Sequence, residues 1–149
     1  MELSLEQLRA AIEQQGYITD KETIVTVYLG LKLEKPLLIE GPPGVGKTEI
    51  AKVLSQVFDT ELIRLQCYEG LDENKALYEW NYQKQLIKIQ LSQVNTPGQC
   101  QTEEDGLFSE EYLLERPLLK AIRAEQKPVL LIDEVDKVDQ EFEAFLFEV

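Results

Sequence analysis

Residues 41–48 read Gly41-Pro42-Pro43-Gly44-Val45-Gly46-Lys47-Thr48, which fits the pattern G-x-x-x-x-G-K-[ST] at every fixed position. Gly41 and Gly46 let the backbone turn tightly and bring N–H groups close to phosphate oxygens. Lys47 supplies a positive charge for the β- and γ-phosphates, and the Thr48 hydroxyl can join the shell of a Mg²⁺ ion. The stretch therefore predicts binding of a nucleoside triphosphate. The competing interpretation is a Gly/Pro-rich turn with an incidental lysine.

The residues on either side of this stretch have the order that a phosphate site needs. Residues 36–40 (Pro36-Leu37-Leu38-Ile39-Glu40) form a short apolar run, which is typical of a buried parallel strand. Residues 48–58 carry apolar side chains at helical spacing. The N-terminus of such a helix adds a partial positive charge to the anion site. We therefore expect a strand, a phosphate loop and a helix in an α/β fold.

Composition limits the classes of partner. The 149 residues suffice for one domain with a sizeable core. The 28 acidic residues outnumber the 15 basic ones and give a net charge of −13. This balance argues against nucleic acid as the main partner, because affinity for DNA or RNA comes largely from Lys and Arg. The chain has no His and no C-x-x-C spacing, so zinc and haem sites are not expected.

No secretory signal is visible in the sequence, and no apolar run reaches the roughly 18–20 residues of a membrane helix. We therefore expect a cytoplasmic protein with no membrane partner.

Residues 1–34 predict a helical lead-in. Ser4 and Gln7 have the spacing of a capping box, which predicts a helix from Ser4 to Gln15, with Gly16 ending it. Thr19 and Glu22 repeat that spacing before the apolar stretch 24–33. We interpret this stretch as a second helix, although its β-branched residues would also suit a strand.

The middle of the chain predicts several short elements. Residues 61–68 predict a strand, and a helix is expected to begin near Asp72. Residues 78–86 have helical spacing and 87–91 alternate, so we expect a helix that gives way to a short strand. Residues 95–106 have the composition of a loop. Ser109 predicts the start of another helix, in which Pro117 either causes a kink or occupies the first turn of the main part.

A second motif follows at residues 129–134, which read Val129-Leu130-Leu131-Ile132-Asp133-Glu134. The apolar run predicts a strand buried on both faces, and the two acids then lie at its carboxyl end, where open α/β sheets bind ligands. Asp133 is the candidate for holding Mg²⁺, and Glu134 is the candidate general base that deprotonates the attacking water. The alternative is a strand that ends in a solvated turn. A final helix, capped by Asp139, is expected to have its apolar residues between Phe142 and Val149 on one face.

Together the two motifs resemble those of the AAA+ ATPase superfamily. Three stretches are similar to MoxR-type AAA+ ATPases, in particular the branch associated with carbon monoxide dehydrogenase maturation: Leu37–Thr48, Leu65–Asp72 and Asp133–Lys137. The resemblance implies a P-loop NTPase fold with three α/β/α layers and a mostly parallel sheet. It also implies ATP and Mg²⁺ as cofactors and an insertion near residues 87–106. It extends the nucleotide site to Glu40, and to Tyr17 and Ile18 beside the adenine.

The resemblance also implies an assembly and a task. Family members form ring homo-oligomers, remodel or activate client proteins that are often metalloenzymes, and frequently work beside a von Willebrand A-type partner. They continue past the region matched here with a fourth strand, an arginine finger and a helical lid. We therefore expect residues 1–149 to be the N-terminal part of one AAA+ nucleotide-binding domain, incomplete at the C-terminus, with its P-loop core at 35–149.

Two other functions compete with an ATP-hydrolysing remodeller. One is a nucleotide-binding module that switches conformation without turnover in this truncated form. The other is a GTP-using relative similar to a restriction-system subunit, because the sequence contains no base-specific motif.

Overall fold

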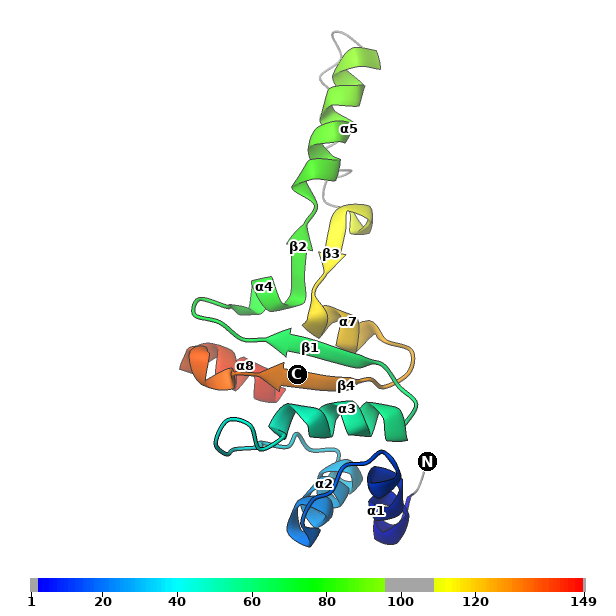
Figure 1. Ribbon diagram of the computed structural model, residues 1–149. Helices are drawn as coiled ribbons and strands as arrows, with labels where there is room; N and C mark the ends of the chain where they lie inside the picture. Colours follow the sequence, from blue (N-terminus) through cyan, green and yellow to red (C-terminus); the bar gives the residue numbers. More distant parts are fainter. Residues whose placement is uncertain (1–2, 96–108, 149) are drawn as a thin grey trace.

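Figure 1 shows the computed structural model, which describes residues 3–95 and 109–148. At one end, helices α1 (Leu5–Gln14) and α2 (Lys21–Leu33) lie side by side. The next layer is α3 (Lys47–Val57), whose buried side chains share one hydrophobic cluster with those of α1 and α2. Both helices that the sequence predicts within residues 1–34 are present.

A small parallel sheet forms the next layer (Figure 1). It consists of β1 (Leu62–Gln66) and β4 (Val129–Asp133), paired in register from Leu62 opposite Val129 to Gln66 opposite Asp133. One face of the sheet turns toward α3, because Val129 packs against the α3 cluster. The predicted α/β class and both of these strands are confirmed.

Three helices cover the other face of the sheet: α4 (Glu73–Leu77), α7 (Pro117–Arg123) and α8 (Gln140–Glu148). They contribute Ala76, Leu118 and Phe142 to a second hydrophobic cluster, which also contains buried and half-buried residues of both strands. Asp139 caps α8 by accepting a hydrogen bond from the Phe142 N–H at 2.9 Å, as predicted. Val149 lies outside the described residues.

The strand predicted at residues 36–40 is absent from the described structure. These residues form irregular backbone, and the side chains of Leu38 and Ile39 are 71% and 43% exposed. A strand needs a neighbour to accept and donate its ladder hydrogen bonds, and no described strand lies beside this segment. For a related reason β4 is half-buried at every position instead of buried on both faces, since β1 is its one described strand neighbour.

Residues 78–115 depart from the sequence prediction in the order of their elements. A strand comes first, β2 (Tyr78–Trp80), and the helix follows it as α5 (Tyr82–Asn95). The alternation at 87–91 therefore belongs to a helix. Instead of one helix after Ser109, the chain forms a 3₁₀ turn, η1 (Glu110–Tyr112), and a strand, β3 (Leu113–Glu115). Pro117 then occupies the first turn of α7, one of the two predicted alternatives.

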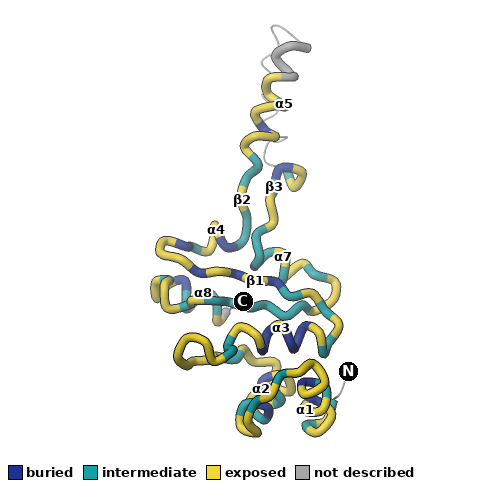
Figure 2. The backbone as a smooth tube through the Cα atoms, viewed as in Figure 1, coloured by how far each residue is buried: buried dark blue, intermediate teal, exposed yellow. Residues whose placement is uncertain are grey.

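These elements form an arm that projects from the body (Figure 1). β2 and β3 pair as antiparallel strands, with Tyr78 opposite Glu115 at the base. The predicted insertion at 87–106 and the predicted loop at 95–106 lie mostly outside the described residues. Figure 2 shows that buried residues are concentrated in the body, whereas the described residues of the arm are largely exposed or half-buried.

The caps of the first two helices explain where they begin. Ser4 and Gln7 exchange both hydrogen bonds of the predicted capping box. The second helix is capped by Asp20, which accepts a hydrogen bond from the Thr23 N–H at 2.8 Å, and not by Thr19. A carboxylate also favours the positive end of the helix dipole, which explains why the cap lies one residue later than predicted.

Ile12 and Ile18 provide a matched test of this core. Ile12 is 0% exposed within the cluster shared by α1, α2 and α3, whereas Ile18 is 92% exposed. We expect Ile12→Ala to lower the free energy of unfolding by about 2–5 kcal/mol, because it leaves a cavity. Ile18→Ala should change it by no more than about 0.5 kcal/mol. Urea denaturation measures both, and equal losses in the two variants would contradict this packing.

Within residues 3–95 and 109–148, no helix combines the length and the apolar character needed to cross a membrane.

Candidate nucleotide site

The phosphate loop leads into α3, as predicted, and its last two residues, Lys47 and Thr48, begin the helix. Gly44 and Gly46 have φ angles of 85° and 86°, a left-handed conformation that side chains with a Cβ rarely adopt. Gly46 is also the N-cap of α3, and in the described structure no side chain caps this helix. The first amides of α3 therefore remain available for an anion.

Lys47 turns back into its own loop. Its Nζ atom donates hydrogen bonds to the carbonyl oxygens of Gly41, at 2.5 Å, and Pro42, at 2.8 Å. The ammonium group is thus held over the loop backbone, where the predicted phosphates would bind. A phosphate would replace these two carbonyl oxygens as its hydrogen-bond acceptor.

The two acids lie at the carboxyl end of β4. Asp133 is its last residue, opposite Gln66, and the backbone carbonyl of Asp133 accepts a hydrogen bond from the Cys67 N–H at 2.9 Å. In Figure 1 the carboxyl ends of both strands and the phosphate loop at the start of α3 lie on the same side of the body. The structure therefore brings the two predicted motifs to one edge.

Glu134 has an uncommon backbone conformation, with φ 57° and ψ 42°. A residue with a Cβ occupies this left-handed region at a cost of about 1–3 kcal/mol, and such residues cluster at functional sites. The conformation ends β4 and begins the 3₁₀ turn η2 (Val135–Lys137). A turn directly after the strand is part of the alternative interpretation of this motif.

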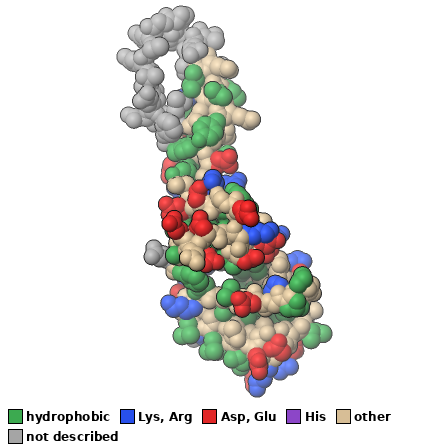
Figure 3. Space-filling model, turned by 90° about the vertical axis from the view of Figure 1, so that its left-hand side faces the viewer, with side chains coloured by type: hydrophobic (Ala, Val, Ile, Leu, Met, Phe, Trp, Pro, Cys, Tyr) green, Lys and Arg blue, Asp and Glu red, His purple; other side chains and the backbone are tan. Residues whose placement is uncertain are grey.

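Each acid is paired with a basic residue that the sequence motif does not include. Asp133 Oδ2 accepts a hydrogen bond from Arg64 Nη2 at 2.6 Å. Glu134 forms an ion pair with Lys137, and the hydrogen bond to Glu134 raises the pKa of Lys137. The charges of Glu134, Asp136 and Glu69 contribute to the same pKa shift. Figure 3 looks onto this edge, and acidic side chains gather across its middle with basic ones among them.

Cys67 directly follows β1 and is 1% exposed. Burial raises the pKa of its thiol, and the negative charges of Asp133, Asp136 and Glu134 raise it further. The thiol therefore stays protonated at neutral pH and acts as a small hydrophobic side chain.

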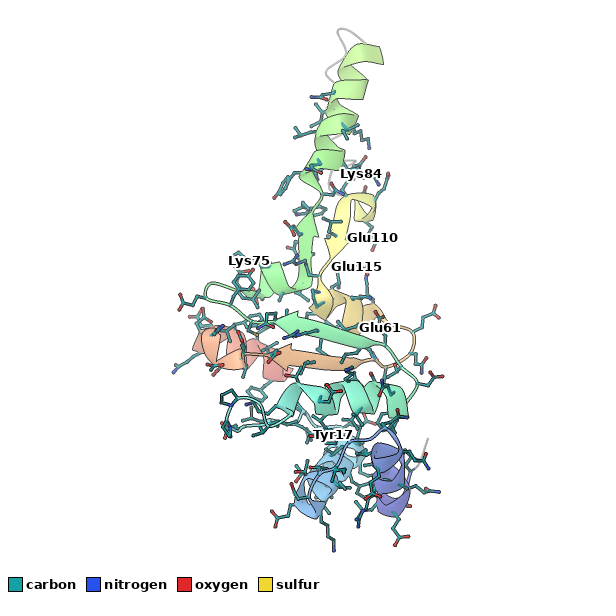
Figure 4. All side chains as sticks on the ribbon, in the orientation of Figure 1. Tyr17, Glu61, Lys75, Lys84, Glu110 and Glu115 are labelled. Atoms are coloured by element: carbon teal, nitrogen blue, oxygen red, sulfur yellow. The ribbon has the colours of Figure 1, made fainter. Side chains whose placement is uncertain are left out.

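Tyr17 lies between α3 and the α1–α2 pair (Figure 4). A Cβ placed on Gly46 would be 3.8 Å from the Tyr17 ring, so the ring lies beside the phosphate loop. Ile18 points into solvent, and Glu40, Pro43 and Val45 are exposed on the segment that leads through the loop. The structure thus places Tyr17 next to the loop and leaves Ile18 without a described partner.

The residues present suit Mg²⁺ better than a metal held by protein alone. In the described part of the chain, no three side chains of Asp, Glu, Cys or His are grouped to hold an ion. Mg²⁺ in nucleotide sites is typically bound by one or two protein oxygens, with phosphates and water completing its shell. Thr48 in the first turn of α3 and Asp133 at the end of β4 would supply those oxygens.

The AAA domain, in its dynein-related subfamily, matches residues 36–148, which is more than half of the chain. The chain belongs to the AAA domain family. Its mixed α/β fold with a small parallel sheet agrees with part of a P-loop AAA domain. Family membership makes it a relative of ATPases that bind ATP and Mg²⁺.

Two uncharacterized proteins of Staphylococcus aureus are similar to this AAA domain over 109 residues. The protein of strain bovine RF122 / ET3-1 is 29% identical, and that of strain USA300 is 28% identical. Each alignment covers 73% of this chain and 34% of the relative. The chain therefore spans about a third of the length of the curated relatives it matches. No solved structure matches it significantly.

Proposed function

We propose that this AAA domain binds and hydrolyses ATP and belongs to a MoxR-type remodelling ATPase. One observation carries the proposal: the phosphate loop and the acids at the carboxyl end of β4 lie at the same edge of the body (Figure 1). In P-loop proteins this edge holds the triphosphate and its metal. The family match over residues 36–148 supports the same conclusion.

Each residue has a distinct role in the proposed reaction. The amides of the loop and of the start of α3 hold the phosphates, and Lys47 neutralises the β- and γ-phosphate charge. Thr48 and Asp133 hold the Mg²⁺ that accompanies the nucleotide, which supplies further neutralisation of phosphate charge. Glu134 orients the attacking water and accepts its proton. Tyr17 contacts the nucleotide from the α1–α2 side, and Glu40 and Ile18 flank it.

The wider task is also part of the proposal. A ring homo-oligomer would use ATP hydrolysis to remodel or activate a client protein, with a von Willebrand A-type protein as a second partner. The MoxR-type motifs support this task, and the projecting arm gives the domain a surface outside its nucleotide core. A net charge of −13 agrees with a protein client and not with nucleic acid.

A second function has its own supporting observation. The Glu134 carboxylate forms an ion pair with Lys137 through Oε2, so this oxygen is not free to accept a hydrogen bond from water. A domain that kept this pair after binding nucleotide would switch conformation without turnover. A GTP-using relative is the third candidate. Tyr17 lies where the nucleotide base is expected, and no described residue there has been assigned to distinguish adenine from guanine.

Nucleotide competition separates these functions. We expect unlabelled ATP to displace a fluorescent ATP analogue from the full chain, and steady-state phosphate release to follow. Mg²⁺ should be required, and EDTA should remove binding of the triphosphate. Displacement by GTP at tenfold lower concentration than ATP would favour the GTP-using alternative. Binding without phosphate release would favour the switch, and no displacement by either nucleotide would contradict all three.

A further inference from the structure

Arg64, Gln66 and Asp133 form one connected polar group on the sheet face that turns toward α3. Residues two apart on a strand share a face, so Arg64 and Gln66 lie on the same side of β1. The register places Asp133 directly opposite Gln66. Arg64 Nη2 donates to Gln66 Oε1 at 2.8 Å and to Asp133 Oδ2 at 2.6 Å. Its guanidinium is therefore tethered to both strand ends.

In the ion pair between Arg64 and Asp133, the acid is more shielded from solvent than in an ordinary surface salt bridge. The Asp133 side chain is 23% exposed, whereas that of Arg64 is 54% exposed. Water and salt screen such a pair less than one with two exposed partners. A charge-assisted hydrogen bond of 2.6 Å also fixes the orientation of the carboxylate. The carboxylate assigned to Mg²⁺ is thus already oriented, and one of its oxygens is already occupied.

We propose that Arg64 is a positioning residue that acts as the internal counter-ion of Asp133. In this role it sets the affinity of the site for Mg²⁺. This inference rests on the proposed role of Asp133 as a metal ligand. Arg64 holds the carboxylate in one orientation while the site is empty. It also competes with the metal, because the guanidinium occupies Oδ2 and repels a second cation beside it. For Oδ2 of Asp133 to hold a metal, this hydrogen bond would have to open, and a metal on the other carboxylate oxygen would lie beside the guanidinium charge.

Two other described basic residues at this edge pair with groups other than the Asp133 carboxylate. Lys137 is engaged by Glu134, with Asp136 and Glu69 nearby. Lys47 is engaged by the loop carbonyls of Gly41 and Pro42. Arg64 is consequently the described cation that contacts Asp133. Removing its charge leaves the carboxylate free for the metal and removes the nearby repulsion.

Direct metal titration tests the inference without requiring nucleotide turnover. Mn²⁺ serves as the probe for Mg²⁺, and electron paramagnetic resonance of free Mn²⁺ gives the dissociation constant for the full chain. We expect Arg64→Gln to bind Mn²⁺ about 3- to 10-fold more tightly than wild type, the range given by losing one partly shielded ion pair. Arg64→Lys, which retains the charge, should stay near wild type.

Arg9→Gln is the matched control, because Arg9 also pairs with a carboxylate, that of Glu13, but on α1. It should leave Mn²⁺ affinity unchanged. The inference is overturned if Arg64→Gln gains no Mn²⁺ affinity, or if Arg9→Gln gains as much. A repeat with ADP present separates this result from the proposed function. Tighter Mn²⁺ binding without any nucleotide binding supports Arg64 as counter-ion and contradicts the ATPase proposal.

Discussion

Replacing Lys47 with alanine is expected to remove measurable ATP binding while the protein stays folded. Its ammonium group is held over the loop by the carbonyls of Gly41 and Pro42, and the loop motif assigns this charge to the β- and γ-phosphates. Charged hydrogen bonds contribute about 1.5–3 kcal/mol each, so losing those to two phosphates should weaken binding at least about 100-fold. Equilibrium titration with a fluorescent ATP analogue measures the dissociation constant.

Lys52→Ala is the matched control for that experiment. Lys52 lies on the same helix, is exposed, and pairs with Glu49 one turn earlier. This substitution makes the same change in charge and helix propensity without touching the phosphate loop. We expect ATP affinity within about twofold of wild type and a change in unfolding free energy below about 0.5 kcal/mol. Equal loss of binding in both variants would mean that Lys47 has no special role.

Glu134→Gln should leave ATP binding intact and stop hydrolysis. Glutamine has nearly the same shape and meets the same cost in the left-handed conformation at φ 57°, so the end of β4 should not move. The amide cannot accept the proton of the attacking water. General-base catalysis contributes about 10²- to 10⁴-fold, and steady-state phosphate release should fall by that factor.

Glu13→Gln provides the comparison, since Glu13 is also a glutamate paired with a basic residue, Arg9. Because Glu13 lies on α1, the Glu13→Gln variant should hydrolyse ATP at the wild-type rate. Loss of nucleotide binding in Glu134→Gln would point to a structural role for the residue. A wild-type rate of phosphate release in Glu134→Gln would show that another group acts as the base.

The parts of the fold that follow from local chemistry were predictable. The phosphate loop and α3 depend on glycines and a helical pattern within a short stretch, and Ser4 and Gln7 cap α1 as their spacing predicts. β4 begins with four apolar residues, β1 carries apolar side chains at Leu62, Ile63 and Leu65, and the two strands pair in parallel. In these cases the residues that specify an element are close together in the sequence, or their hydrophobic pattern fits one type of secondary structure.

The wrong predictions concern elements whose state depends on distant neighbours. Residues 36–40 have the composition of a buried strand, but no described strand pairs with them, so the backbone stays irregular. The alternation at 87–91 is compatible with a strand and also with a helix. Pairing of Tyr78–Trp80 with Leu113–Glu115 decides it, because β2 then precedes the helix. A single sequence contains no information about which segments pair.

The basic partners of the acids were missed for a similar reason. Lys137 follows Glu134 by three residues, a spacing that a helical turn brings into contact, and η2 supplies such a turn. Arg64 is far from Asp133 in sequence, and the register of β1 against β4 alone brings the two together. Strand alternation places Arg64 and Gln66 on one face, and this signal could have suggested them as candidates.

The arm joins the body through a single narrow neck. Tyr78 and Glu115 are paired there, the Arg116 N–H donates to the carbonyl of Leu77 at 3.1 Å, and the Arg116 guanidinium pairs with Glu79. Arg123 of α7 pairs with Glu115 and with Glu110 of η1, and Lys84 of α5 pairs with Glu111; Figure 4 labels Lys84, Glu110 and Glu115. Because the chain leaves and re-enters the body at adjacent positions, we expect that substitutions on the exposed surface of the described part of the arm leave the strand ends of the sheet and the phosphate loop in place.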